Sequence, residues 1–235
     1  MSRVLIPLPD RDFDVTEVAV PWRLLVDAGH EVVFATEAGT TPAADQRLLD
    51  GVLFGKLGAE PEPITFYREL ERDEAFRRPA RWGDLDPAGY DALLLPGGHA
   101  PGMRQYLGSP ELQGKIAEFW ALDRPVAAIC HGVLPLARSG VLRGIRTTCL
   151  PKYMERSAYL ATAWRLGRYY RTYPAYVEDE VRALGALVER GPLVLSKRGT
   201  ATDDSPAFVV QDGRYVSARW PGDAYLFGRG LLALL

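Results

Sequence analysis

The chain has 235 residues, 47% of them hydrophobic, and its 28 lysines and arginines nearly balance its 30 aspartates and glutamates. This length suffices for one large core, and the balanced charge excludes a general attraction to nucleic acid or to an anionic membrane surface. We therefore predict a single domain over residues 1–235 that acts on a small, weakly charged molecule.

Cysteine usage and hydropathy narrow the class further. The two cysteines, Cys130 and Cys149, are too few for a disulfide framework, and no Cys/His spacing is typical of a zinc site, so no metal and no cofactor are predicted. Apolar stretches such as residues 92–96 and 126–129 are much shorter than the roughly 20 residues that cross a bilayer. Residues 1–6 lack the features of a secretory signal, which favours a cytoplasmic protein without membrane contact.

The first elements have the rhythm of a parallel sheet. Residues 4–7 form a short apolar run typical of a buried strand, and residues 17–28 place apolar side chains at helical spacing before Gly29. Residues 31–35 are again a short apolar run. This β-α-β order predicts a parallel sheet and therefore an α/β fold.

The next region is irregular, because glycine, proline and charged residues are scattered over residues 39–87. We interpret it as an insertion or flap that contains a polar helix over residues 66–78. Regular structure is predicted again for a strand at residues 90–96, a helix at 109–122, a strand at 125–129 and a helix at 132–139.

Residues 150–176 are rich in tyrosine, tryptophan and arginine. They are interpreted as a long amphipathic helix that covers the core or a subunit interface, or alternatively as a lid over the active site. A helix at residues 181–187, strands at 193–195, 208–210 and 215–217, and a final helix at 226–235 complete the predicted domain.

The strongest chemical signal is Cys130, which follows an apolar strand and precedes Gly132 and a helical run. Backbone N–H groups and the dipole at a helix start favour a thiolate, and a strained strand-to-helix turn would present the nucleophile. His131 adds an imidazole that could act as general base and acid. The alternative is that Cys130 is a small buried packing residue.

Two further segments are candidates for the same site. Leu95-Pro-Gly-Gly-His ends a predicted strand, so the amides of Gly98 and His131 could form an oxyanion hole, with Gly97 and His99 against the substrate. An ordinary tight turn is the alternative, but ligands of open parallel sheets bind at the carboxyl ends of strands. Glu17 lies in the first turn of a helix, where an acid is commonly a partner of the helix dipole.

Together these segments resemble the DJ-1/PfpI superfamily, the class I glutamine amidotransferase-like proteins, and within it the Hsp31-like branch. The resemblance rests on Asp14-Val-Thr-Glu-Val, Leu95-Pro-Gly-Gly-His and Ala128-Ile-Cys-His-Gly, with weaker similarity at Glu178-Asp-Glu-Val and at Asp212-Gly-Arg-Tyr-Val-Ser-Ala-Arg. It implies a three-layer α/β/α sandwich with a mostly parallel, flavodoxin-like central sheet and helical insertions at 39–87 and 150–176. It also implies that Cys130 is the nucleophile, that Glu17 hydrogen-bonds the thiol and that His131 is the catalytic histidine.

The resemblance leaves the acid of a Cys/His/acid triad open. Hsp31-like members imply Glu155, with Asp203 and Asp204 as weaker candidates. PfpI-like members take the acid from a neighbouring subunit, and the corresponding segment here offers Glu69, Glu71, Asp73 and Glu74. No histidine follows His131, which argues against the His-x-Glu pair of glutamine-dependent amide transfer. Cys149 is interpreted as a packing residue, with a redox partner of Cys130 as the alternative.

The resemblance implies a cofactor-independent enzyme, expected as a homodimer, that acts on a small carbonyl compound. The reaction would be of the glyoxalase III type, in which a 2-oxoaldehyde becomes a 2-hydroxy acid. Two alternatives stay open: a cysteine amidase or peptidase of the PfpI type, and a stress or chaperone-like protein whose Cys130 senses oxidants.

Overall fold

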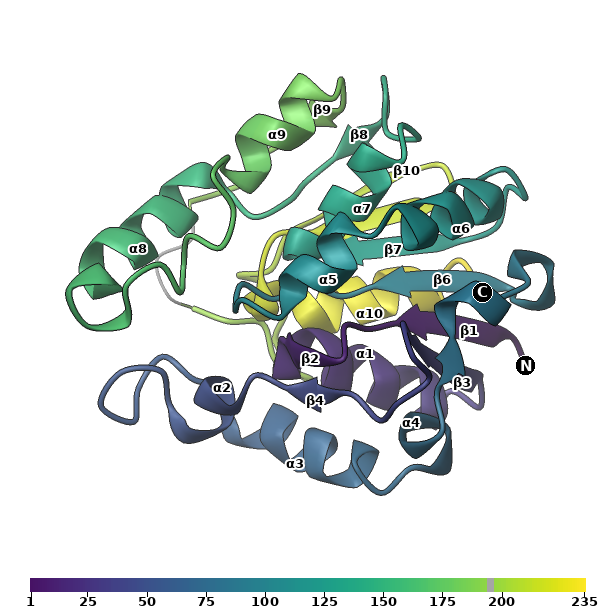
Figure 1. Cartoon of the computed structure of the whole chain (residues 1–235), viewed down its shortest axis with the longest axis horizontal. Coiled ribbons are helices and arrows are strands. Elements are labelled where there is room, and N and C mark those ends of the chain that lie inside the picture. The colour runs from purple at the N-terminus through teal and green to yellow at the C-terminus, as the bar shows by residue number, and fades with distance from the viewer. Residues whose placement is uncertain (194–196) are drawn as a thin grey trace.

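A seven-stranded sheet forms the centre of the computed structural model, which describes residues 1–193 and 197–235 (Figure 1). The strand order is β10-β11-β7-β6-β1-β3-β5. All neighbouring pairs are parallel except β10 and β11, which are antiparallel. The bounds are β1 Arg3–Pro7, β3 Glu31–Thr36, β5 Ala80–Arg81, β6 Ala92–Leu95, β7 Val126–Ile129, β10 Val209–Asp212 and β11 Tyr215–Ala218.

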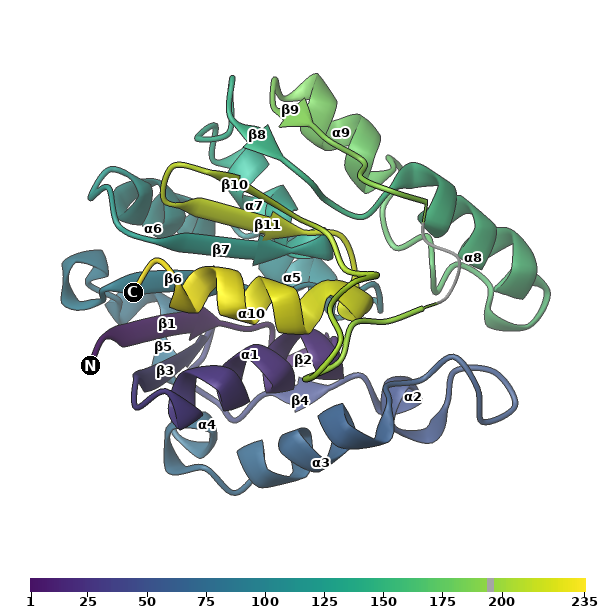
Figure 2. The ribbon, with the colours of Figure 1, turned by 180° about the vertical axis from the view of Figure 1, so that it is seen from behind.

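Helices cover both faces of this sheet. Helices α5 (Met103–Gly108), α6 (Pro110–Trp120) and α7 (Val133–Arg138) lie on the face toward the viewer in Figure 1. Helices α1 (Val15–Asp27) and α10 (Ala224–Leu232) lie on the other face, seen in Figure 2. The predicted three-layer α/β/α sandwich with a mostly parallel sheet is confirmed. The strands β6 and β7 are buried along their whole length, as expected for central strands covered on both faces.

The range 39–87 is only partly an excursion from these layers. It contains β4 (Ala43–Ala44), which pairs with β2 (Arg11–Phe13), followed by α2 (Gln46–Asp50), α3 (Pro61–Leu70) and α4 (Glu74–Arg77). The predicted helix over residues 66–78 is wrong, because α3 ends at Leu70 and Asp73 begins α4 by accepting hydrogen bonds from two backbone N–H groups. The range ends in β5, which pairs with β3, so its last part belongs to the central sheet.

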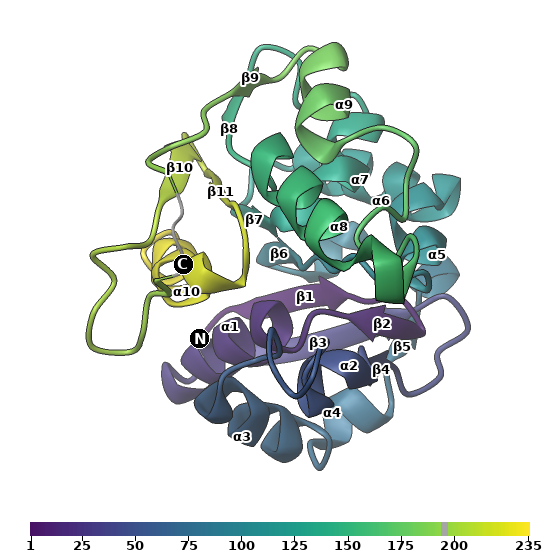
Figure 3. The same ribbon diagram turned by 90° about the vertical axis from the view of Figure 1, so that its left-hand side faces the viewer.

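The range 150–176 is a helix followed by irregular chain. Helix α8 (Lys152–Leu166) ends at Gly167, which has a φ of 57°, and α9 (Val177–Ala183) follows ten residues later (Figure 3). The continuous helix predicted over 150–176 is therefore too long. The pair β8 (Arg146–Thr147) and β9 (Leu187–Val188) brackets this part, and short 3₁₀ turns lie at residues 82–84, 87–89, 130–132 and 221–223.

The remaining predicted elements are displaced by a few residues. The helix expected at 181–187 is α9, the final helix expected at 226–235 is α10, and the strand predicted at 193–195 falls mostly outside the described residues. None of the helices in the described part of the chain combines the length and apolar composition needed to cross a bilayer.

Candidate active site

Cys130 occupies the turn that joins β7 to α7. Its φ is 80°, a left-handed backbone conformation that side chains with a Cβ adopt at a cost, and such strain clusters at functional sites. The turn packs tightly against the end of β6, because a Cβ at Gly132 would lie 2.1 Å from the carbonyl oxygen of Leu95. The sharp strand-to-helix turn predicted at Cys130 is therefore present, and the role of Cys130 as nucleophile stays a prediction.

Glu17 brings helix α1 into contact with the ends of β6 and β7. Its carboxylate Oε2 accepts a hydrogen bond of 2.8 Å from the backbone N–H of Gly97, and the side chain is fully buried. A Cβ at Gly97 would lie 2.7 Å from Oε2 and 2.8 Å from the backbone nitrogen of His131, so only glycine fits there. The other oxygen of Glu17, Oε1, has no hydrogen-bond partner among the described residues.

Burial and mutual repulsion determine the charges of Glu17 and Cys130. Burial raises the pKa of Glu17 well above its usual range, the charge of Asp14 raises it further, and the nearby Cys130 thiol lowers it. Burial likewise raises the pKa of Cys130, and the charge of Glu17 adds to this, while the backbone N–H of His131 lowers it. Because two adjacent buried anions repel each other, we infer that the pair carries at most one negative charge.

The unpartnered Oε1 indicates where the proton of this pair lies. Glu17 Oε2 already accepts the N–H of Gly97, whereas Oε1 has no hydrogen-bond partner among the described residues and is free to carry the proton. A neutral Glu17 also removes the charge that raises the pKa of Cys130. Protonation of Glu17 therefore favours the thiolate of Cys130, against the effect of burial.

His131 lies beside the sulfur as a neutral imidazole. Its Nδ1 is 3.6 Å from Cys130 Sγ, and burial lowers its pKa to about 3. Because the same burial makes the ring a weak proton acceptor, it does not by itself ionise the thiol. The N–H of Gly98 donates no hydrogen bond to another described residue and is therefore available to a ligand. The oxyanion hole formed by the amides of Gly98 and His131 stays a prediction.

A cavity of about 760 Å³ opens in front of Cys130, at the carboxyl ends of β6 and β7. His99 lines it: its ring stacks on Tyr170 with centroids 4.4 Å apart and meets Tyr169 edge-on at 4.6 Å. Burial lowers the pKa of His99 to about 4, so it is neutral near pH 7. Gly98, Glu17 and Cys130 also line the cavity, whereas Gly97 and His131 are not among the lining residues.

The two segments predicted as insertions meet at this cavity. The hydroxyl of Tyr169 donates a 2.5 Å hydrogen bond to Asp45, and the guanidinium of Arg165 lies 4.7 Å from the ring centroid of Phe54. Helices α2 and α8 lie at the same end of the molecule in Figures 1 and 3. Residues of both segments line the cavity, including Leu48 and Leu57 from one and Tyr153, Met154, Ala158 and Tyr170 from the other.

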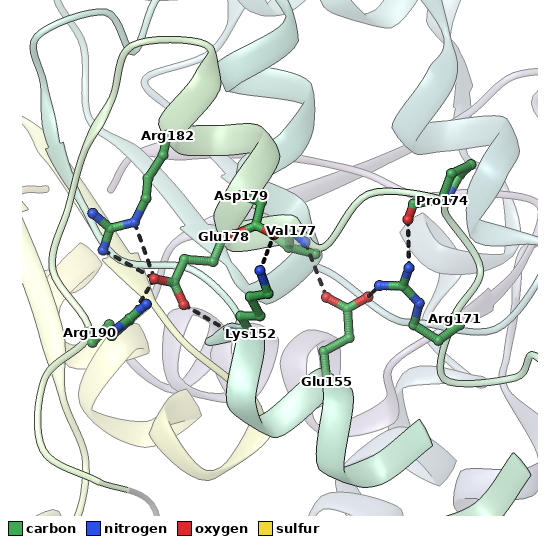
Figure 4. Close-up of polar contacts among 9 residues, drawn as sticks. All are labelled: Lys152, Glu155, Arg171, Pro174, Val177, Glu178, Asp179, Arg182 and Arg190. Carbon is green, nitrogen blue, oxygen red and sulfur yellow. Dashed lines mark hydrogen bonds and ion pairs between the residues drawn. The ribbon is translucent and has the colours of Figure 1, made fainter. Parts of the chain in front are cut away.

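Glu155 lines the cavity, but its hydrogen bonds point away from His131. Its Oε2 accepts the N–H of Val177, the first residue of α9, at 3.1 Å, and its Oε1 is 3.6 Å from Arg171 (Figure 4). The predicted triad contact between Glu155 and His131 is absent among the described residues. Glu155 instead caps α9, because a helix N-terminus has unpaired N–H groups that a nearby carboxylate can accept. The spacing of residues along the sequence could not predict this contact.

Glu178 reciprocates this arrangement. Its Oε2 accepts the N–H of Lys152, the first residue of α8, at 2.9 Å, while its Oε1 binds Arg190 at 2.6 Å and Arg182 at 3.1 Å (Figure 4). Neither α8 nor α9 has a side-chain cap from its own N-cap residue. Each helix therefore supplies the carboxylate that caps the other, and this pair fixes the wall of the cavity.

The pKa of Glu155 predicts a specific dependence of stability on pH. Burial raises it from 4.5 to about 7, so Glu155 favours the folded state below pH 4.5 and this contribution is lost as the pH rises through about 7. We expect the free energy of unfolding, relative to Glu155→Gln, to fall by ~3 kcal/mol between pH 4.5 and 7.5. Urea denaturation of both proteins across this range measures it.

Parallel stability curves for the wild type and Glu155→Gln would show that Glu155 does not titrate in this range. The same variant separates the structural role from the predicted catalytic one. A fall of kcat/KM by more than about tenfold at pH 6, with unchanged stability, would support Glu155 as the acid that orients His131.

The other acid candidates have their own partners. Asp204 pairs with Arg229, Glu69 with Arg23, Glu71 with Arg68 and Glu74 with Arg78, while Asp73 caps α4 and Asp203 accepts the N–H of Ser205 in a turn. None of them hydrogen-bonds His131 among the described residues. Cys149 is buried, and its pKa is raised by burial, as for a packing residue. Among residues 1–193 and 197–235, no group of three His, Cys, Asp or Glu could hold a metal ion.

Sequence reasoning missed Asp14, Arg198 and Trp220 as cavity residues. Asp14 caps α1 by accepting the N–H groups of Thr16 and Glu17, and burial raises its pKa to about 6. Arg198 lies 5.2 Å from the ring centroid of Trp220 and 3.6 Å from Glu60. Asp14 stood within the motif that contains Glu17, whereas no local pattern pointed to the other two.

An α/β/α sandwich with a strained cysteine on a strand-to-helix turn and a buried glutamate beside it defines a DJ-1/PfpI-type protein. The chain belongs to this superfamily, because residues 8–198 match the family described as ThiJ/PfpI family-like. A Pyrococcus abyssi protein named a deglycase is 30% identical over 234 residues, which cover 99% of both chains. An uncharacterized Schizosaccharomyces pombe protein is 32% identical over 179 residues, 73% of this chain and 67% of its own.

Solved structures agree on the fold. Glyoxalase III from Candida albicans superposes with a TM-score of 0.68 at 21% identity and covers 100% of this chain and 97% of its own. At this identity the likeness concerns the fold alone. The superfamily expected from the three motifs is confirmed, and the names of the relatives indicate an enzyme of the DJ-1/PfpI type.

Proposed function

We propose that the protein converts a small 2-oxoaldehyde into a 2-hydroxy acid without a cofactor, by glyoxalase III-type chemistry at Cys130. The observation that carries this proposal is that Cys130 and the fully buried Glu17 line the same cavity, where Glu17 is held by the N–H of Gly97. The proposed reaction oxidises one carbon of the substrate and reduces its neighbour. It requires a nucleophile that binds the first carbon and a group that moves a proton between the two. The glyoxalase III name of one structural neighbour and the deglycase names of several relatives support a carbonyl substrate.

The reaction begins when Cys130 Sγ adds to the aldehyde carbon. A C–S bond forms, and the former carbonyl oxygen takes up a proton to give a hemithioacetal. This proton comes from Glu17, which leaves its carboxylate free to remove the proton from the same carbon. A proton then returns to the neighbouring carbon and the hydroxyl proton passes to the ketone oxygen, which oxidises the first carbon and reduces the second. Water then cleaves the resulting thioester and releases the 2-hydroxy acid and the thiol. In sum, one 2-oxoaldehyde and one water give one 2-hydroxy acid, without an external oxidant or reductant.

The amides of Gly98 and His131 have a defined part in this scheme. The unengaged N–H of Gly98 would donate to the substrate oxygen, which bears negative charge after sulfur addition. The imidazole of His131, whose Nδ1 is 3.6 Å from the sulfur, would position the water that cleaves the thioester in the last step. The same parts would serve an amidase or peptidase, which is the second candidate function.

The test is product analysis with methylglyoxal in the absence of glutathione. We expect lactate by NMR from the wild type, and deuterium at C2 of lactate when the reaction runs in D₂O, because the carried proton exchanges with solvent. N-acetylarginine mixed with methylglyoxal tests the deglycase variant, and a fluorogenic aminopeptidase substrate tests the hydrolase. Lactate no faster than in Cys130→Ala would refute the proposal, and peptide cleavage without lactate would favour the peptidase.

A further inference from the structure

We infer that the substrate carries a bulky, uncharged, apolar substituent next to its reactive carbonyl carbon. This inference rests on the proposed function and names the substrate class within it. Its basis is the size and the chemistry of the cavity in front of Cys130, neither of which the reaction itself requires.

The cavity is much larger than the smallest 2-oxoaldehydes. Its volume of about 760 Å³ lies within the range of pockets that enclose drug-sized ligands, roughly 300–1,000 Å³. Methylglyoxal would leave most of this space filled with water and would touch few of the lining side chains. A larger substituent can displace this water and contact the walls.

The walls of the cavity are mainly apolar. Helix α8 contributes Met154, Ala158 and Ala161, and other segments contribute Leu48, Leu57 and Trp220. Leu57 is 56% exposed and Leu193, which also lines the cavity, is 67% exposed. An apolar substituent would remove this surface from water, which is the main source of affinity in such pockets.

The ionisable residues of the cavity favour a neutral substituent. Burial raises the pKa of Glu17 well above its usual range and that of Glu155 to about 7. The guanidinium of Arg198 is 3.6 Å from Glu60, and Arg198 is the only lysine or arginine among the described residues that line the cavity. Its pairing with Glu60 leaves no unpaired lysine or arginine in this part of the lining to bind an anionic substituent.

Ala158 and Ala161 set the width of the cavity along α8. They lie one helical turn apart on the face that lines the cavity, and their small side chains leave room for the substrate. The reciprocal caps of Glu155 and Glu178 fix this helix in place (Figure 4). A larger side chain at residue 158 would therefore shorten the space for the substituent without touching Cys130.

The test compares 4-methyl-2-oxopentanal with methylglyoxal, two aliphatic 2-oxoaldehydes that differ in the size of the substituent. We expect kcat/KM of the wild type to be at least about tenfold higher for the larger substrate, since even one methylene in an apolar pocket is worth about 10- to 200-fold. Ala158→Phe should lower this value at least tenfold and change that for methylglyoxal less than about threefold. Ala163→Phe, on the same helix but outside the cavity lining, should change neither.

Equal kcat/KM for the two substrates, or an equal loss of both in Ala158→Phe, would overturn the inference while leaving the proposed function intact. A binding experiment tests the substrate class independently of the proposed reaction. Binding of 4-methyl-2-pentanone and acetone to Cys130→Ala is compared by NMR saturation transfer. If no 2-oxoaldehyde reacts, the proposed function fails, and the binding data alone decide: tenfold tighter binding of the larger ketone supports the substrate class, and equal binding overturns it.

Discussion

Cys130→Ala is expected to lower kcat/KM for 2-oxoaldehydes at least about 10³-fold. The sulfur is the nucleophile in the proposed reaction, and no water molecule can replace the covalent bond that it forms. The alanine retains a Cβ, so the strain of a φ of 80° is the same in both proteins. We therefore expect the melting temperature to change by only a few degrees, measured by differential scanning calorimetry beside the kinetics.

Cys149→Ala is the matched control for this variant. Cys149 is the other buried cysteine, and it does not line the cavity. The substitution should destabilise the fold slightly, by the loss of one buried sulfur, and should leave kcat/KM within about twofold. Equal activity losses in the two variants would refute the assignment of Cys130 as the nucleophile.

Glu17→Gln is expected to separate the stabilisation of the thiolate from the transfer of a proton. The amide oxygen of glutamine can accept the N–H of Gly97 as Oε2 does, and its NH₂ group can donate to the sulfur as a protonated Oε1 would. Alkylation of Cys130 by iodoacetamide should therefore stay within about tenfold of the wild type. Turnover should fall by about 10²- to 10⁴-fold, because an amide cannot carry the proton between the two carbons.

Iodoacetamide alkylation, followed by mass spectrometry, and turnover are measured on the same samples. Retained turnover would mean that His131 moves the proton and Glu17 only orients the thiol. A collapse of alkylation together with turnover would mean that Glu17 is ionised beside the sulfur, contrary to the effect of burial on its pKa. Both interpretations require that Glu17→Gln has the melting temperature of the wild type, because a substitution at this fully buried residue could also destabilise the fold.

Some of the site could be predicted because the residues lie close in sequence to the elements that place them. Cys130 and Gly98 follow directly on β7 and β6, and neighbouring parallel strands bring their carboxyl ends together. Glu17 was the first-turn acid of a helix with an ordinary local explanation. Only the resemblance to a family predicted that Glu17 lies beside the thiol. The structure gives the reason, because the N–H of Gly97 holds the Glu17 carboxylate at the ends of β6 and β7.

The acid partner of His131 shows the opposite case. Glu155 was chosen as the nearest suitable carboxylate after His131 along the chain. In the fold its carboxylate accepts the N–H of Val177 at the start of α9, while Glu178 of α9 accepts the N–H of Lys152 at the start of α8. Neither helix has a side-chain cap from its own N-cap residue, so each is capped by the other. Distance along the sequence carried no information about this exchange.

The sequence by itself determined the α/β fold with its parallel sheet, the sharp turn at Cys130 and the set of chemical groups, because short apolar strands, glycine turns and helix starts act locally. The tertiary structure decided how these groups behave. Burial beside Asp14 raises the pKa of Glu17, burial makes His131 a neutral imidazole, and the meeting of residues 39–87 with residues 150–176 creates the cavity. Desolvation and cavity shape arise only when distant segments pack together, which is why the pattern of residues could not reveal them.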